Sequence, residues 1–564
     1  MFLSRQTFGT LGLTAILLFL VGPPLVSLLY GSFRNSPPGR PGEFTLENFA
    51  TFLSPNMYGA LLDTFLYATA STLLAIFLGT TLAWVLERTR VRFKRAIVLT
   101  IVLTIATPHI LVPASWIMLA SPRIGLFNNL LRPFFGPEFV LFNVYSWTGL
   151  ILITGISSST LAFLLMAAAV RNIDPHFEEA AMSSGAGTFT ILRRVTFPLL
   201  KPAMLTVFLL LFVNVIQYFE TPFILGWQAG IRVFSAWVYS YTRLTPTDYG
   251  AASSLSLLYL AIMAIGVFAY LRVVKSSHKY ATVTPKAFRS RQIELGKGKI
   301  IAVLFLIVYL LLHTILPFAI VLWAAFTPYF VQPSFKALSL LTLEQFQYAF
   351  AEPSLLKAFV NTMIMATSAA TVVVILTAII AWIVIKTNLP GRGLLDGLAF
   401  STTAYPGIVL SLGLFWFYVQ FPMGIYGTLL VLTLATITNY TAHGVRFASG
   451  TIIQIHKDLE EVAMASGASW FYTFRRIILP LMKGGLFGAW VYVAFSSMRD
   501  LSTYLLLYTN ESIIMSVIMF DHWYGGAYNG LSATALIMMV SMGGVIVTSR
   551  ALLGGLHLKE RLRE

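Results

Sequence analysis

The chain of 564 residues is 57% hydrophobic and only 11% charged, with a formal net charge of +16 and a mean hydropathy of +0.79. Soluble domains are about 45–50% apolar and about 25% charged, so this composition excludes an ordinary soluble domain and indicates a protein of the lipid bilayer. The basic residues form short clusters between apolar stretches rather than one basic face, which argues against a nucleic-acid-binding protein.

The first half of the chain contains six charge-free windows, each of the length that a membrane-crossing helix needs, about 20 residues. They lie between Arg5 and Arg34, Asp63 and Glu87, Arg95 and Arg123, Glu138 and Arg171, Lys201 and Glu220, and Asp248 and Arg272. The first window is longer than the apolar part of a signal peptide and lacks an Ala-x-Ala end, so it predicts an uncleaved first span.

The second half contains five such windows. They lie between Lys299 and Lys336, Lys357 and Lys386, Asp396 and Arg446, Lys483 and Arg499, and Asp521 and Arg550. The window from Asp396 to Arg446 is long enough for two helices, with a turn near residues 420–424. The sequence therefore predicts an all-α integral membrane protein with about 12 transmembrane helices.

Clusters of basic residues follow the second, fourth and sixth predicted spans, and such clusters mark the cytoplasmic side of a membrane protein. The clusters are Arg88, Arg90, Arg92, Lys94 and Arg95; Arg193, Arg194 and Lys201; and Lys275, Lys279, Lys286, Arg289, Arg291 and Lys297. The C-terminal residues Lys559, Arg561 and Arg563 fall on the same side, so both termini are predicted to be cytoplasmic. Six spans in each half give the two halves the same orientation, which makes them a parallel repeat.

The repeat is visible in the sequence itself. At an offset of 298 residues, Asp63-Thr64 matches Asn361-Thr362, Ala83-Trp84 matches Ala381-Trp382, and Pro108 matches Pro406. Further along the chain the offset is 282 residues, so the first half contains an insertion of 16 residues. We place this insertion in the outer loop from Ser121 to Ser146, which is rich in proline and glycine.

The repeat divides the chain into two equal parts. The first part is residues 1–282, with core spans at about 57–275, and the second is residues 283–564, with core spans at about 357–552. The basic segment from Ser276 to Gly298 is predicted to join them.

The clearest repeated motif is a polar segment between the fourth and fifth spans of each half. Residues 179–185 read Glu-Ala-Ala-Met-Ser-Ser-Gly before Arg193-Arg194 and Pro198, and residues 461–467 read Glu-Val-Ala-Met-Ala-Ser-Gly before Arg475-Arg476 and Pro480. Carboxylates near the start and arginines near the end suit the helix macrodipole, so the segments 172–202 and 454–484 each predict a short cytoplasmic helix. Gly185 and Gly467 fall where such a helix ends. A solvated connector is the simpler interpretation, but the spacing kept in two otherwise different halves favours a function.

The pattern Glu-Ala-Ala, three residues, Gly, nine residues, Ile-x-Leu-Pro resembles the cytoplasmic loop motif of permeases in type I binding-protein-dependent ABC importers. The first copy departs conservatively at Val195 and Phe197, and the second departs at Val462. By this resemblance, each motif forms a coupling helix that inserts into a cleft on an ATPase subunit. The residues that the resemblance implies for coupling are Glu178, Glu179, Ala181, Gly185 and Pro198 in the first segment and Glu460, Glu461, Ala463, Gly467 and Pro480 in the second.

The resemblance also implies a two-lobed permease fold in a bacterial inner membrane. Its partners are expected to be two copies of an ATPase subunit on the cytoplasmic side and one periplasmic substrate-binding protein. The sequence contains no Gly-x-x-x-x-Gly-Lys-[Ser/Thr] phosphate-binding loop, so ATP and Mg²⁺ are expected on the partner ATPase subunits and no cofactor on this chain. The chain itself is therefore predicted not to be an enzyme.

Fusion of two permease halves into one chain resembles the ferric iron uptake permeases. Residues 498–506, Met-Arg-Asp-Leu-Ser-Thr-Tyr-Leu-Leu, are similar to the acidic segment that ends their penultimate helix. Residues 219–223, Phe-Glu-Thr-Pro-Phe, are a looser partner in the first half. Importers of thiamine, phosphonate and sugar phosphate share the fused layout, so these substrates stay open beside ferric iron.

Glu220 and Asp500 are the acidic residues of these two segments. Each lies 17 to 19 residues after the lysine that starts its span, roughly 26–28 Å at about 1.5 Å per residue and so near the outer edge of the hydrocarbon. This depth suits an acidic pair that meets a released cation, whereas interfacial capping, or an ion pair such as Arg499 with Asp500, explains the same residues. The other candidates for a substrate pathway are Asn214, Gln217 and Ser497, which helix–helix hydrogen bonds explain equally well.

Two other classes of membrane protein fit the sequence less well. A secondary transporter needs buried, paired ionisable residues along its path, and the predicted spans contain very few. A membrane enzyme needs clustered His, Asp or Glu at the membrane surface, and only the two polar segments concentrate carboxylates. His109, His313 and His443 lack the spacing of metal ligands and are expected to pack between helices. The sequence thus predicts no catalytic site and no metal site.

Overall fold

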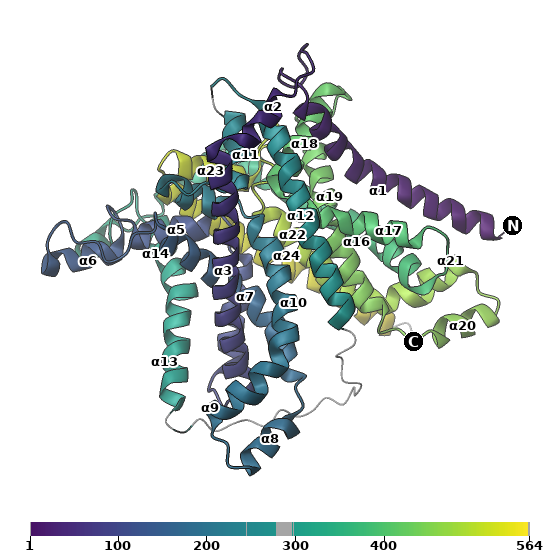
Figure 1. Ribbon diagram of the computed structural model, residues 1–564, viewed down its shortest axis with the longest axis horizontal. Coiled ribbons are helices and arrows are strands. Elements are labelled where there is room, and N and C mark those ends of the chain that lie inside the picture. Colours follow the sequence, from purple (N-terminus) through teal and green to yellow (C-terminus); the bar gives the residue numbers. More distant parts are fainter. Residues whose placement is uncertain (1, 244, 278–295, 297, 562–564) are drawn as a thin grey trace. The chain divides into compact units, whose positions relative to one another are not determined.

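The computed structural model describes residues 2–243, 245–277, 296 and 298–561, and the regular elements of this part of the chain are helices (Figure 1). The first twelve are α1 (Phe2–Ser32), α2 (Glu47–Ala50), α3 (Pro55–Arg88), α4 (Lys94–Leu103), α5 (Leu111–Ala120), α6 (Leu126–Phe135), α7 (Trp147–Arg171), α8 (Pro175–Ser183), α9 (Thr188–Ile191), α10 (Phe197–Ile216), α11 (Phe234–Arg243) and α12 (Tyr249–Ser277). The second twelve are α13 (Gly298–Leu310), α14 (Leu316–Ala325), α15 (Glu344–Ala351), α16 (Pro353–Lys386), α17 (Arg392–Ser401), α18 (Gly407–Gln420), α19 (Leu429–Ile452), α20 (Asp458–Ala465), α21 (Trp470–Thr473), α22 (Leu479–Arg499), α23 (Met515–Tyr524) and α24 (Tyr528–Arg561). The all-α prediction is confirmed.

The predicted number of spans agrees with these helices. Nine described helices are long and apolar enough to cross a membrane, and two bent pairs raise the number to eleven. The remaining predicted span, the second of the window from Asp396 to Arg446, is α19, whose 24 residues include polar side chains such as Asn439 and His443. Because α19 packs against α16 and α22, much of its surface faces protein rather than lipid, so a polar composition is tolerated there.

The chain forms two compact units that interleave in the sequence. Residues 1–54, 237–261 and 344–564 make up unit 1, and residues 55–236 and 262–343 make up unit 2. Each unit contains a core of three packed helices. In unit 2 these are α3, α7 and α10, which lie side by side in Figure 1, and in unit 1 they are α16, α19 and α22.

The first helix of each sequence half belongs to the unit built mainly from the other half. In unit 1, α1 packs on α17, α18 and α19, with Leu17 and Leu20 buried in the core. In unit 2, α13 and α14 pack on α4 and α5, and Leu306 and Tyr309 are buried against α3, α7 and α10. The periodicity of single helices does not predict this exchange. Of the predicted joining segment from Ser276 to Gly298, residues 278–295 and 297 lie outside the described residues.

The sequence repeat is also a structural repeat. The helices α3 and α16 have 34 residues each and begin and end at positions related by the offset of 298 residues. The pairs α4–α5 and α17–α18 bend by 109° and 106°. Each break contains one of the repeated prolines, Pro108 or Pro406, which lacks an N–H and disfavours helical geometry in the residue before it.

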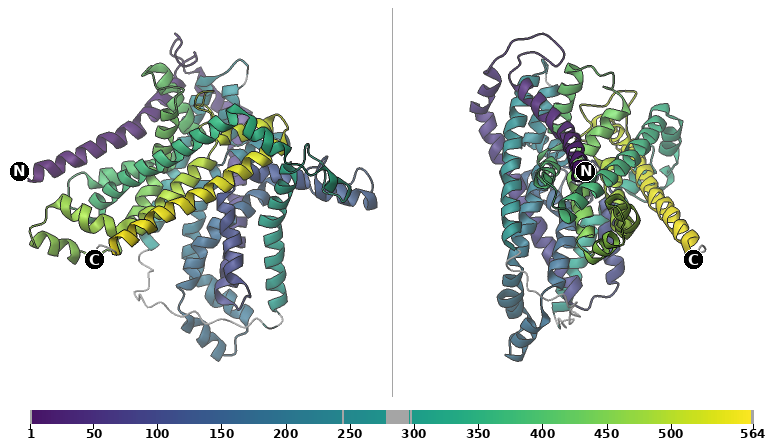
Figure 2. Two further views of the ribbon diagram at one scale, coloured as in Figure 1. Left: turned by 180° about the vertical axis from the view of Figure 1, so that it is seen from behind. Right: turned by 90° about the vertical axis from the view of Figure 1, so that its right-hand side faces the viewer.

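The inserted loop of the first half, predicted to lie outside the membrane, contains α6. The side chain of Asn128 is buried and donates to the carbonyl oxygens of Ala120, Ser121 and Phe142, at 3.3, 2.9 and 2.8 Å. Its Oδ1 accepts from the backbone N–H of Phe142 at 3.1 Å. One buried amide therefore closes this loop. Among the long helices, α24 runs as a single rod, drawn in yellow in Figure 2.

Candidate functional site

The two polar segments fold as matching helix–turn–helix arms. In the first arm, Asp174 precedes α8 and its Oδ1 accepts from the backbone N–H of His176 at 3.0 Å, while Pro175 occupies the first helical position. In the second arm, α20 starts with Asp458 and carries two further carboxylates in its first turn. Acidic residues at a helix N-terminus are stabilised by the macrodipole, so both short helices form where the sequence predicts them.

The short helices α8 and α20 end in the same backbone motif at the repeated glycine. Gly185 has φ +81° and Gly467 has φ +83°, a left-handed conformation that favours glycine. The N–H of Gly185 donates to Met182 O and the N–H of Ala186 donates to Ala181 O, at 2.9 and 3.0 Å. The same two bonds recur after α20, each at 3.0 Å, and end at the carbonyls of residues 464 and 463. These are Schellman turns, which reverse the chain toward the next helix.

Each arm re-enters its core through a π-helical turn at equivalent positions, Leu192–Thr196 and Phe474–Ile478. The repeated prolines Pro198 and Pro480 follow these turns directly and occupy the first or second position of α10 and α22. A proline lacks the N–H of a regular helical bond, so a locally widened helix before it accommodates the missing donor.

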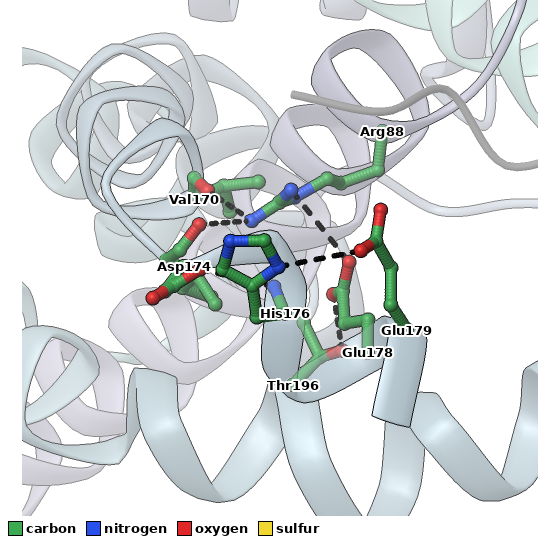
Figure 3. A network of polar contacts seen from close by, with 8 residues as sticks. Arg88, Val170, Asp174, His176, Glu178, Glu179 and Thr196 are labelled. Carbon is green, nitrogen blue, oxygen red and sulfur yellow. Dashed lines mark hydrogen bonds and ion pairs between the residues drawn. The ribbon is translucent and has the colours of Figure 1, made fainter. Parts of the chain in front are cut away.

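The helix α8 is joined to the core of unit 2 by a buried ion pair (Figure 3). Arg88, the last residue of α3, is fully buried, and its Nη1 lies 3.6 Å from Oε2 of Glu178 in the first turn of α8. Its Nη2 donates to Val170 O and Ile173 O at 3.0 and 2.9 Å. The hydroxyl of Thr196 donates to Oε1 of Glu178 at 2.8 Å. Removing one partner of such a buried pair costs about 3–5 kcal/mol, because the remaining charge is uncompensated.

An equivalent pair stands in the second arm. Lys386, the last residue of α16, places Nζ 2.9 Å from Oε1 of Glu460 in the first turn of α20. Nζ also donates to Ile455 O at 2.7 Å. Lys386 matches Arg88 at the offset of 298 residues, and Glu460 and Ile455 match their counterparts at 282. The sequence marks Arg88 only as a cytoplasmic charge, and its pairing with Glu178 becomes visible only in the structure.

The two glutamates of each motif have different surroundings. Glu178 is buried with 3% of its surface exposed, whereas the Glu179 carboxylate is partly exposed and lies 3.3 Å from Nδ1 of His176. In the second arm Glu461 is exposed. Ala463 is buried and Ala181 is intermediate, so the small residues face inward. Of these glutamates, Glu179 and Glu461 are therefore the accessible ones, and Asp458 at the start of α20 is exposed as well.

Both arms also expose large apolar side chains in segments rich in charge. Phe177 and Phe189 are 54% and 74% exposed, and Val462 and Phe471 are 65% and 64% exposed. Further exposed apolar residues of the two arms are Met182, Leu459, Met464 and Tyr472. Exposed apolar clusters rimmed by charge are typical of protein interfaces. Sequence reasoning missed these residues, although aromatic residues beside arginines on a polar connector are a visible signal.

The predicted pathway residues of unit 2 lie at and beyond the C-terminal end of α10. Asn214 and Gln217 donate from their amides to the backbone of their own helix, at Leu210 O and Val213 O, with distances of 2.7 and 2.8 Å. Glu220 is 8% exposed and precedes the π-helical turn Pro222–Gly226. The structure thus places these three side chains along one short stretch of chain.

In unit 1 the predicted residues follow the end of α22. Asp500 is 8% exposed, and its Oδ2 accepts from Oγ1 of Thr503 at 2.6 Å and from Nδ2 of Asn439 at 3.2 Å. Its Oδ1 accepts from Ser502 and from the backbone N–H of Thr503, both at 3.2 Å. Ser497 donates to Ala494 O at 2.9 Å. Both carboxylate oxygens therefore already have donors from the protein.

All three lone histidines have described contacts with other segments of the chain, and His109 lies edge-on to Tyr218 with the ring centroids 6.2 Å apart. Nε2 of His313 and Oγ1 of Thr160 are 2.9 Å apart, and the imidazole stacks on Tyr309. The ring of His443 lies among Tyr440 and Tyr492. Within the part of the chain that the structure describes, no group of three or more histidine, aspartate or glutamate residues is placed to hold a metal ion.

Comparison with known proteins gives one family and several relatives. Residues 61–279 match the family described as binding-protein-dependent transport system inner membrane component. The ferric transport system permease protein FbpB of Actinobacillus pleuropneumoniae is 25% identical over 477 residues, which cover 83% of this chain and 67% of that protein. The Fe(3+)-transport system permease protein FbpB 2 of Haemophilus influenzae is 23% identical over 532 residues, 94% of this chain and 96% of that protein. A shorter relative, the trehalose/maltose transport system permease protein MalF of Thermococcus litoralis, is 26% identical and matches 46% of this chain.

These matches confirm the family resemblance found in the motif. The relative from Haemophilus influenzae is covered almost completely by this chain, so both proteins carry the two halves in one polypeptide. The matched region 61–279 contains most of α3, all of α7 and α10, and the whole first arm.

Proposed function

We propose that this chain, which belongs through residues 61–279 to the inner membrane components of binding-protein-dependent transport systems, is the fused permease of an ATP-driven importer of ferric iron. The observation that carries the proposal is the pair of equivalent arms, each with a short helix, a Schellman turn at glycine and an ion pair to its own core. A connector that only joins two spans is not expected to have the same three features in both halves of the chain.

Each arm is proposed to dock one ATPase subunit on the cytoplasmic side, so two copies serve one permease. The partly exposed Glu179 and the exposed Glu461 supply charge to the contact, and the apolar residues that include Phe189 and Phe471 supply the buried centre. ATP and Mg²⁺ belong to those subunits. Closure of the two ATPase subunits then moves the arms and opens the permease outward, and no chemical step is proposed on this chain.

A periplasmic binding protein is proposed to deliver the substrate on the opposite side. The positive-inside pattern supports this orientation, with both chain termini in the cytoplasm of a bacterial cell and the inserted loop around α6 outside. Since the insertion is present in the first half alone, it makes the outer surface asymmetric. An asymmetric surface suits a partner that docks in one orientation.

Ferric iron is the proposed substrate because ferric transport permeases match this chain along most of its length. Glu220 and Asp500 are proposed to lie on the pathway, since carboxylate oxygens suit a hard cation. The pathway is proposed to include Asn214, Gln217 and Ser497 as well. The protein donors around Asp500 support a second role for that residue as a cap of the chain turn after α22.

The test is reconstitution of the chain with its ATPase subunit and candidate binding proteins in proteoliposomes. ATP hydrolysis should rise when the ferric-loaded binding protein is added, and radiolabelled iron should accumulate inside the vesicles. If a binding protein for thiamine, phosphonate or sugar phosphate stimulates ATP hydrolysis instead, the chain is still an importer permease, but its substrate is not ferric iron.

A further inference from the structure

We infer that Arg88 and Lys386 are positioning residues that fix each coupling helix to the inner end of its own core helix, and that the first attachment is stiffer than the second. The inference rests on the proposed function, because it concerns how movement of the arms reaches the membrane core. It deepens that function by naming the side chains that transmit the movement and by making the two arms unequal.

Arg88 and Lys386 are placed where movement of a coupling helix can pass to a core helix. Arg88 and Lys386 are the last residues of α3 and α16, the 34-residue helices that begin on the outer side by the predicted topology. Each base contacts a glutamate in the first turn of the coupling helix and a carbonyl of the chain that leads into it, Ile173 O or Ile455 O. A displacement of the coupling helix therefore bears directly on one end of a core helix.

The first attachment has more contacts and a more rigid donor. The planar guanidinium of Arg88 donates to two carbonyls through Nη2, whereas the ammonium of Lys386 donates to one. Thr196 adds a hydrogen bond to Glu178, and the equivalent position in the second arm is Ile478, which has no side-chain donor.

The first ion pair is also more deeply buried than the second. The side chains of Arg88 and Glu178 are 0% and 4% exposed, and those of Lys386 and Glu460 are 4% and 13% exposed. The Arg88–Glu178 pair is the longer of the two, at 3.6 Å against 2.9 Å for Lys386–Glu460. The greater stiffness of the first attachment is therefore attributed to its burial, where water competes less, and to the hydrogen bonds of Arg88 Nη2 and Thr196. Close to the first pair, Glu87 contacts Lys94 and Arg171 at 2.8 and 3.5 Å. In the second half the positions that correspond to Glu87 and Arg171 are the uncharged Ile385 and Ile453, and the position that corresponds to Lys94 is Arg392.

The absence of native cysteine allows a direct measurement of this stiffness. One cysteine pair, Phe77→Cys with Ser184→Cys, reports α3 against the end of α8. The matched pair in the other half, Ile375→Cys with Ser466→Cys, stands at the same repeat positions. All four residues are exposed, so spin labels there do not disturb a core. The full chain is labelled in lipid nanodiscs, with and without its ATPase subunits, and distances are measured by double electron–electron resonance.

The expected result is a narrow distance distribution for the first pair and a broader one for the second, both with means that ATP does not change. Arg88→Met should broaden the first distribution, Arg88→Lys should bring it to the width of the second, and Lys386→Arg should narrow the second. If Arg88→Met does not fold, the variants Arg88→Lys and Lys386→Arg are sufficient to test whether these bases set the widths of the distributions.

Equal widths in the two halves would contradict the inequality of the arms. A mean distance that shifts with ATP, or a width insensitive to these substitutions, would overturn the positioning role. A merely stabilising ion pair changes the yield or melting temperature of the variants and leaves the distributions alone. Because the measurement works without ATPase subunits, its failure is distinguishable from failure of the proposed importer function.

Discussion

Asn439 on α19 donates a hydrogen bond through Nδ2 to Oδ2 of Asp500, 3.2 Å away, at the end of α22. The same Nδ2 donates to Oγ1 of Thr503 at 3.1 Å, so one amide joins two helices and the turn that follows. Asp500 thus has a structural role whether or not it meets a substrate. Any test of the Asp500 charge must separate this structural role from a role in substrate binding.

The double variant Glu220→Gln with Asp500→Asn should reduce iron uptake while stimulation of ATP hydrolysis by the binding protein persists. Both substitutions keep the side-chain shape and remove the charge that attracts a hard cation. Radiolabelled iron uptake and ATP hydrolysis are measured on the same vesicles.

Asn439→Ala is the control for the structural role of Asp500. It removes one donor and keeps both carboxylates, with an expected loss of stability of about 1 kcal/mol. Iron uptake by this variant should stay close to that of the wild type when corrected for the amount of folded protein. Unchanged iron uptake by the double variant would mean that Glu220 and Asp500 only cap the turns in which they lie. These two residues would then no longer be evidence for a cationic substrate.

Gly185→Ala and Gly467→Ala should each weaken coupling between ATP hydrolysis and transport. A Cβ meets nothing within 4 Å at either glycine, so the cost arises from the left-handed φ alone, at about 1 kcal/mol. Strain of this size shifts the Schellman turn and the direction of the following segment. The ratio of transport to hydrolysis measures the effect.

Gly391→Ala is a matched control, because Gly391 has φ +86° and equally open surroundings but lies outside both arms. Its backbone strain should be similar and its transport ratio normal. Equal damage from all three substitutions would trace the loss to stability and remove the special role of the arms.

Phe189→Ser and Phe471→Ser should each weaken assembly with the ATPase subunit. Both side chains are mostly exposed, so the permease itself should change in stability by less than about 0.5 kcal/mol. Truncating an aromatic residue at the centre of an interface costs more than about 1 kcal/mol, which is roughly fivefold or more in affinity. Co-purification and titration of the ATPase subunit onto nanodiscs measure the change.

Phe335→Ser serves as the comparison, since Phe335 is 94% exposed and follows the predicted outer end of α14. This variant should bind the ATPase subunit like the wild type. Loss of binding there, or normal binding by both arm variants, would disconnect the exposed aromatic residues from the docking surface.

Much of this fold follows from local sequence pattern. The apolar windows predict the spans, and prolines 108 and 406 coincide with the bends of two of them. Acidic starts and glycine ends predict α8 and α20, because capping and left-handed turns depend on residues only a few positions apart. The number of spans needs the window lengths as well, since α19 is too polar to pass a hydropathy test and is predicted because the charge-free window from Asp396 to Arg446 is long enough for two helices.

The remaining features depend on contacts between distant segments. Periodicity identifies α1 and α13 as apolar helices and says nothing of the helices on which they pack. Arg88 and Glu178 are separated by 90 positions, and nothing near either residue indicates the other. The repeat contains a usable clue, because a base stands at both 88 and 386 and a glutamate at both 178 and 460.

The most direct test of the central claim is the energy requirement of transport by the reconstituted complex. Proteoliposomes containing this chain, its ATPase subunit and ferric-loaded binding protein should accumulate iron only when ATP is present on the side of the membrane that carries the ATPase subunits. A proton or sodium gradient alone should drive none. Uptake that follows an ion gradient without ATP, and without the ATPase subunit, would contradict the account and make the chain a secondary transporter.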